Sequence, residues 1–154
     1  MKNPYLNTEY LGIRMDEQAT AANPLQQKKV RQALNCGFDR SQMLRTLRNG
    51  VGKPASSGFT PRGLPSFDET TAPGYAYTPS RAARLLADAG FPNGKGLPPV
   101  TLLCNQDYLD LCTFIARQWE DLGIKVNLEM VETALLRERM RNGQAPFFRA
   151  SWIA

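Results

Sequence analysis

The last third of the chain alternates short apolar segments with amphipathic ones, and this order constrains the fold more than any other feature. Between residues 124 and 130, apolar and polar side chains alternate strictly, which is typical of a β-strand. Apolar segments at 100–104 and 146–152 predict two more strands. Apolar residues at helical spacing predict helices at 108–122 and from 133 to about 142. This order implies right-handed crossovers onto a mixed sheet with parallel pairs flanked by helices, an α/β fold.

The preceding two thirds of the chain add one strand and three helices to this pattern. A strand is expected at residues 9–15, where apolar residues alternate with smaller or polar ones. Apolar stripes predict helices over 25–37, 39–50 and 78–90, each followed by or ending at a glycine. Residues of the kind that cap helices stand at Asp39, Thr78 and Thr133.

A long segment at residues 49–77 has no consistent hydrophobic period and is rich in glycine and proline. We expect an irregular loop there. A loop of this length within one domain is typical of a functional lid or of a segment wrapped against another part of the protein.

The sequence contains no histidine, so the usual general base at neutral pH is missing. Ser-His-Asp and Cys-His catalysis and histidine-ligated metals are therefore excluded within the chain. The cysteines Cys36, Cys104 and Cys112 form no C-x-x-C pair, and their odd number favours buried thiols, with one bridge left open. We predict no metal and no cofactor.

Length and charge leave two broad interpretations open. With 154 residues, 42% of them apolar, the chain suits one packed domain. Its net charge is +5, and basic residues gather on the helix pair at 25–50 and again at 137–149. Solvated helix faces explain both clusters, and a nucleic-acid-binding module using the 25–50 helix pair is the alternative. Residues 1–8 lack a signal-peptide pattern, so the protein is either cytosolic or begins within a longer chain.

Two glycine-rich segments, 50–54 and 94–96, have some resemblance to phosphate-binding loops. Neither fits, because their lysines precede Pro54 and Gly96 where a Walker A loop requires serine or threonine. We therefore expect no enzymatic activity.

Four segments carry motifs whose order and spacing are more specific than any one of them. They are KVRQAL at 29–34 with FDR at 38–40, YTPSRAARLLADAGFPNG at 77–94, QWEDLGIKV at 118–126 and RASWIA at 149–154. Together they resemble the C-terminal lobe of the family 5 extracytoplasmic solute-binding proteins, which deliver peptides to ABC transporters. The resemblance runs through most of the chain.

This resemblance implies that residues 1–154 form a single α/β lobe, a fragment of a larger protein with a type II periplasmic-binding-protein-like fold. Two lobes joined by a hinge would close over a peptide without catalysis. The implied partners are the peptide ligand, the missing N-terminal lobe and the permease subunits, with no nucleic acid. The implied location is periplasmic or extracytoplasmic, with a lipoprotein anchor. The last motif continues in the family with an aspartate after Ala154 that takes the ligand amine.

The resemblance also names two ligand-binding residues. Arg149 stands where some oligopeptide-binding members have an arginine near the ligand carboxylate, and a guanidinium suits that role through paired donors. Trp152 stands where the family has a pocket tryptophan, whose broad face covers a ligand side chain. The alternatives without a binding role are that Arg149 is exposed at a strand end and that Trp152 packs in the core. Trp119 lies on a core-facing helical stripe and is expected to be structural.

Overall fold

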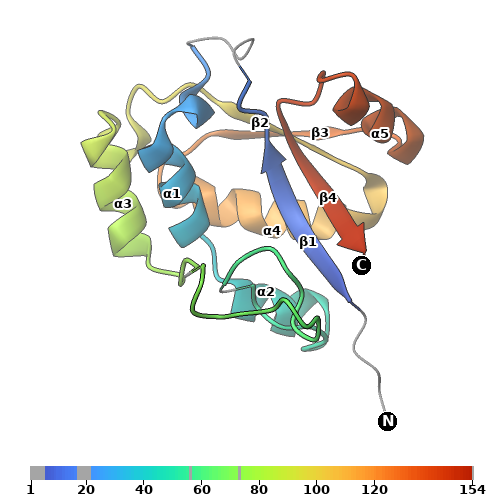
Figure 1. The fold of residues 1–154 in the computed structure, drawn as a ribbon. Coiled ribbons are helices and arrows are strands. Elements are labelled where there is room, and N and C mark those ends of the chain that lie inside the picture. The colour runs from blue at the N-terminus through green and yellow to red at the C-terminus, as the bar shows by residue number, and fades with distance from the viewer. Residues whose placement is uncertain (1–5, 17–21, 56, 73, 154) are drawn as a thin grey trace.

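A computed structural model describes residues 6–16, 22–55, 57–72 and 74–153. In this part of the chain, four strands form one mixed sheet in the order β1-β4-β2-β3 (Figure 1). Strand β2 (Val100–Cys104) runs parallel to both β3 (Val126–Met130) and β4 (Phe147–Ile153). Strand β1 (Asn7–Ile13) pairs with β4 in the antiparallel direction. The predicted mixed α/β sheet with parallel crossovers is confirmed.

Two crossover helices connect the parallel strands. Helix α4 (Leu109–Glu120) joins β2 to β3, and α5 (Thr133–Arg141) joins β3 to β4. The first connection leads from β2 outward to the edge strand β3, and the second leads from β3 back past β2 to β4. Because parallel crossovers are right-handed, these opposite directions place α4 and α5 on opposite faces of the sheet. In Figure 1, α4 lies behind β1 and β4, and α5 lies apart from it at the upper right.

The other helices lie toward the face that carries α4. Helix α1 (Lys28–Cys36) packs against α3 (Pro79–Asp88), and α2 (Arg40–Leu47) contacts α4. The predicted helix from residue 25 begins only at Lys28, because Pro24–Gln26 form a separate 3-10 turn whose first amide is capped by Asn23. Further 3-10 turns occupy Pro92–Gly94 and Gln106–Tyr108.

The helix caps agree with the sequence only in part. The carboxylate of Asp39 accepts the amide of Gln42 at 2.9 Å and caps α2 as predicted. The prediction that Thr133 caps α5 is wrong. Glu132 is the N-cap, since its longer carboxylate reaches the amides of Ala134 and Leu135 at 2.8 and 3.1 Å.

The sheet has a hydrophobic core on each face. The larger core joins α1, α3 and α4 to the inward side chains of β2 and to Phe147. The smaller one joins α5 to Leu103 and Phe148. Trp119 is 1% exposed, stacks on Phe147 with ring centroids 6.0 Å apart, and donates its indole N–H to the Leu34 carbonyl at 3.0 Å. Its expected structural role follows from this packing.

The segment between residues 49 and 77 contains no helix or extended strand in its described part, which excludes residues 56 and 73. It closes on itself through the amide of Gly58, which donates to Ala72 at 3.0 Å. It is also tied to the sheet, because the hydroxyl of Thr8 on β1 donates to the carbonyl of Phe59 at 2.9 Å.

The cysteines Cys36, Cys104 and Cys112 are all buried free thiols. A hydrogen bond with Cys104 and, as a smaller effect, burial raise the pKa of Cys112. These residues pack as small hydrophobic side chains, as the sequence predicts.

Candidate ligand-binding site

The two buried polar side chains of the described part of the chain lie toward the same edge of the sheet. They belong to Asn105, which follows β2 directly, and to Arg149, which lies on the parallel neighbour β4. The pairing of Leu103 with Phe148 places Arg149 level with the last residue of β2. In open α/β sheets, ligands bind outside the carboxyl ends of the strands, so this edge is the candidate site.

Arg149 is held by three side chains from different elements. Its Nη2 atom makes an ion pair with Glu9 of β1 and donates a hydrogen bond to Ser151, and its guanidinium lies 3.0 Å from the ring centroid of Tyr108. The Ser151 hydroxyl donates to Glu9 at 2.7 Å. Glu9 pairs with Ser151 in the β1–β4 register, and Arg149 lies two residues away on the same face. The pairing of β1 with β4 thus builds the cluster.

The charge of Arg149 is buried and compensated. The side chain is only 9% exposed, so the sequence-based alternative of an arginine exposed at a strand end does not describe it. Burial lowers the pKa of Arg149 to about 10, which leaves the guanidinium protonated at neutral pH. The ion pair with Glu9 acts against this effect of burial, because a nearby negative charge favours the charged form of the guanidinium. The buried Nε atom has no hydrogen-bond partner within the described chain, although a buried donor is normally paired.

Asn105 is a further candidate for the site, which the sequence reasoning missed. Its side-chain amide donates to the hydroxyl of Thr133 at 3.1 Å, which orients the group, and its Oδ1 atom is buried without a partner among the described residues. Asn105 therefore has an unpaired acceptor directly after β2, and Arg149 has an unpaired donor on β4. The signal that could have found it is a polar residue placed directly after a buried apolar strand, because such positions face the carboxyl edge.

Trp152 does not join this cluster. Side chains alternate along a strand, so Trp152 projects from the opposite face of β4 to Arg149. Its indole is 41% exposed, which argues against the alternative of a core tryptophan. Its ring lies 5.9 Å from Phe59 of the long loop, and Phe59 lies 5.0 Å from Tyr10 of β1. The two residues expected from the sequence thus lie on two faces of the same strand.

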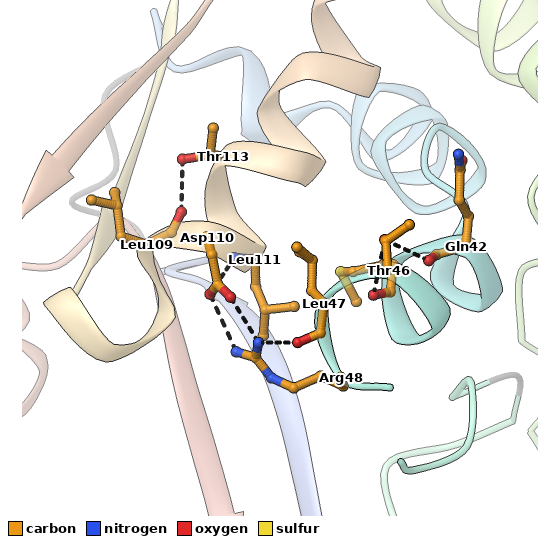
Figure 2. A network of polar contacts seen from close by, with 9 residues as sticks. Gln42, Thr46, Leu47, Arg48, Leu109, Asp110, Leu111 and Thr113 are labelled. Atoms are coloured by element: carbon orange, nitrogen blue, oxygen red, sulfur yellow. Dashed lines mark hydrogen bonds and ion pairs between the residues drawn. The ribbon is translucent and has the colours of Figure 1, made fainter. Parts of the chain in front are cut away.

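A second polar group lies between α2 and the start of α4 (Figure 2). Arg48 makes a two-pronged ion pair with Asp110 at 2.7 and 3.2 Å, and this bond lowers the pKa of Asp110 and raises that of Arg48. A hollow of about 730 Å³ beside it is lined by Gln42, Leu47 and residues of α4. Helix α2 has no fully buried residue, and this ion pair joins it to α4 together with the side chain of Gln118, which accepts the Asp39 amide at 2.6 Å and donates to Gln42 at 3.2 Å.

Basic residues of the α1–α2 pair are used within the fold. Arg31 donates to the carbonyls of Leu25 and Gln26 at 2.8 Å each, and Arg40 donates to Asn35 and lies 4.2 Å from the ring centroid of Phe38. These contacts hold the loops around the helices. Arg31 and Arg40 are therefore engaged within the fold and are not free to bind a phosphate backbone.

Neither a metal-binding cluster nor a membrane-spanning helix is present among the described residues. No group of three or more His, Cys, Asp or Glu side chains in this part is arranged to hold a metal ion. Of the helices described, none combines the length and the apolar character that crossing a membrane requires.

Comparison with solved structures shows the same architecture in peptide-binding receptors. A periplasmic oligopeptide-binding protein from Borrelia burgdorferi matches 96% of this chain and 29% of its own length, with a TM-score of 0.81 and 27% identity. The murein tripeptide-binding protein of Escherichia coli matches 98% of this chain and 30% of its own length, with a TM-score of 0.80 and 28% identity.

Sequence relatives agree with the structures. Heme-binding protein A of Haemophilus influenzae is 31% identical over 143 residues, which cover 90% of this chain and 25% of that protein. The dipeptide-binding protein of Escherichia coli is 24% identical over 156 residues, with 99% of this chain and 28% of that protein covered. The chain thus spans about a quarter of the length of these relatives. None of these names supports the nucleic-acid alternative.

The model of one protein family matches residues 1–154, the whole of the chain. That family is described as the bacterial extracellular solute-binding proteins, family 5, middle region. The chain belongs to this family.

Proposed function

We propose that this chain is one lobe of a substrate-binding receptor that captures peptides and delivers them to an ABC importer. Family membership over the whole chain supports the receptor role, and the likeness to oligopeptide- and tripeptide-binding structures supports peptides as the ligand. Because the chain spans about a quarter of its relatives, a second lobe would supply the opposite wall of the site. Closure of two lobes around a ligand is the usual mechanism of such receptors.

The buried guanidinium of Arg149 is the observation that carries this proposal. A buried charge is costly unless it is compensated, and Glu9 supplies the counter-charge of Arg149. A ligand carboxylate would take the place of Glu9 or share the guanidinium with it. The unpartnered Oδ1 atom of Asn105 would accept an N–H group of the same ligand. Donor and acceptor together suit the end of a peptide.

Trp152 would contribute a half-exposed aromatic face to the other side of the site. Such a face covers ligand side chains of different shapes without demanding one of them. The permease subunits of the importer would be the partners of the closed receptor, and the receptor would act outside the cytoplasmic membrane, held there by a lipoprotein anchor.

Isothermal titration calorimetry of the whole protein with tripeptides tests the proposal. Arg149→Ala should weaken binding of free-acid tripeptides by at least about tenfold, because a charge-assisted contact is lost, and should affect C-terminally amidated tripeptides less. Arg149→Lys keeps the charge but loses the paired donors, so it should weaken free-acid peptides by a smaller factor. Arg137 is exposed on α5, and Arg137→Ala is the matched control. Unchanged affinity in Arg149→Ala would overturn the assignment.

A further inference from the structure

The counter-charge of Arg149 comes from this chain itself, and it uses only part of the guanidinium. Glu9 makes its ion pair through Oε2 to the Nη2 atom of Arg149. The Nε atom of Arg149 is buried and has no hydrogen-bond partner within the described chain. Nε and Nη2 of an arginine lie side by side and can donate in parallel to both oxygens of one carboxylate. Glu9 therefore fills one half of a two-donor site.

The second oxygen of Glu9 is held by another residue of β1. The side-chain amide of Asn7, which lies two residues earlier on the same face of the strand, donates to Oε1 of Glu9 at 2.8 Å. The Ser151 hydroxyl donates to Oε2 at 2.7 Å. These two hydrogen bonds fix the carboxylate of Glu9 so that it meets Arg149 with one oxygen. A carboxylate without these ties could accept from Nε and Nη2 together.

The two partners of the ion pair differ in how firmly the fold holds them. The side chain of Arg149 is 9% exposed and lies 3.0 Å from the ring centroid of Tyr108. The side chain of Glu9 is 37% exposed on the edge strand β1. A carboxylate that already touches water can turn toward it at a low cost in solvation, whereas a buried guanidinium would have to leave its ring. Glu9 is therefore the partner that can be displaced.

We propose that Glu9 competes with the ligand carboxylate for Arg149 and thereby sets how strongly the receptor prefers peptides with a free C-terminus. This inference rests on the proposed function. An incoming carboxylate would have to displace Glu9 or lie beside a second negative charge, and either event weakens its binding. A neutral ligand end would be affected less, because it brings no charge. Glu9 would thus act as a specificity-determining residue.

The test compares trialanine with its C-terminal amide by calorimetry on the whole protein. Glu9→Gln removes the charge and keeps the size of the side chain. It should bind trialanine about five- to tenfold more tightly than the wild type does, and change the affinity for the amide by less than about twofold. Glu9→Asp keeps the charge but draws it back by one methylene, so it should give a smaller gain. Glu138 is exposed on α5, and Glu138→Gln is the matched control.

A double-mutant cycle tests whether Glu9 acts through Arg149. In the Arg149→Ala background, Glu9→Gln should no longer strengthen the binding of trialanine, because the contested donor is gone. A gain that persists in this background would overturn the inference. Circular dichroism verifies that each variant is folded. Glu9→Asp, which retains a counter-charge, decides the matter if Glu9→Gln does not fold.

The remaining outcomes separate this inference from the proposed function. Unchanged or weaker binding of trialanine in Glu9→Gln overturns the competition, as does an unchanged affinity in Glu9→Asp where that variant decides. An equal gain for trialanine and its amide overturns it too, because Glu9 would then act on lobe closure instead of on the ligand carboxylate. In each of these cases, a wild type that binds trialanine leaves peptide capture intact. A wild type that binds neither peptide contradicts the proposed function itself.

Discussion

The two tryptophans of this chain occupy opposite environments, although both are aromatic residues in regular elements. Trp119 is 1% exposed and touches Phe38 and Phe147 with ring centroids 6.1 and 6.0 Å apart. Trp152 is 41% exposed and meets Phe59 on one side. The first residue is therefore a structural anchor, whereas the second is available for contact with a ligand.

Replacing each tryptophan by alanine should separate these roles. Trp119→Ala should lower the free energy of unfolding of the 154-residue chain by about 3–5 kcal/mol, because it leaves a large cavity in the core. Trp152→Ala should lower it by about 1 kcal/mol or less, since water already covers much of the ring. Urea denaturation followed by circular dichroism measures both values. Equal losses in the two variants would contradict the assignment.

At the residue scale, the sequence indicates the roles of residues that belong to a local pattern. It does not indicate the contacts that form when strands far apart in the chain pair with each other. The helical stripe places Trp119 in the core, and the final motif singles out Arg149. The counter-ion Glu9 has no local signal, because it meets Arg149 only through strands that lie about 140 residues apart.

The turn between α4 and β3 packs closely against the 3-10 turn before β2, and each of these turns places a glycine at the contact. Gly123 has φ +87° and lies against the backbone of Asn93, and Gly94 has φ +73° and lies against Gly123. A Cβ atom at either position would overlap backbone carbonyl atoms. These two turns therefore pack together only when both residues are glycine.

Gly123→Ala and Gly90→Ala form a matched pair for this contact. Gly90 has φ +94° but nothing within 4 Å of its would-be Cβ atom, so Gly90→Ala should cost only the left-handed strain of about 1–2 kcal/mol. Gly123→Ala should cost a further ~1–3 kcal/mol from overpacking. Chemical denaturation of the chain measures the free energy of unfolding of both variants. Similar stability of the two variants would show that the close approach does not matter.

The long loop contains a turn whose stability depends on pH. Hydrogen bonds from Thr71 and Thr70 lower the pKa of Asp68 from 3.8 to about 2. Since the carboxylate is favoured in the folded chain, its contribution is present above the unfolded value of about 3.9 and is lost as pH falls through about 2.

A carbon-detected NMR titration of Asp68 should give a midpoint near pH 2 in the wild-type chain. In Thr71→Val, which keeps the side-chain shape and removes the hydroxyl, the midpoint should move up toward the usual value of about 3.9. A midpoint that stays the same in Thr71→Val would exclude the hydroxyl as the cause.

At the element scale, strands and helices were predictable because their periods are local. The first residues of helices were less predictable. Glu132 caps α5 in place of the expected Thr133, since its longer side chain reaches the amides at the start of the helix. The irregular loop has no period at all, and its attachment to β1 through Thr8 comes from tertiary contact alone.

On the scale of the whole molecule, the sequence motifs identified the family and the crossovers, but they did not give the strand order. The edge position of β1 depends on its antiparallel pairing with β4, which joins the two ends of the chain. This pairing also creates the candidate site, because Glu9, Arg149 and Ser151 meet across it. The candidate site therefore depends on the tertiary pairing of β1 with β4.

Native mass spectrometry of the whole protein, purified from its own cells, tests the central claim most directly. The relatives named above include both a haem-binding and a dipeptide-binding protein, so the identity of the retained ligand is decisive. We predict that gentle activation releases a mass equal to that of a short peptide, and that Arg149→Ala retains less of it. Release of a stoichiometric haem or another non-peptide ligand would contradict peptide capture.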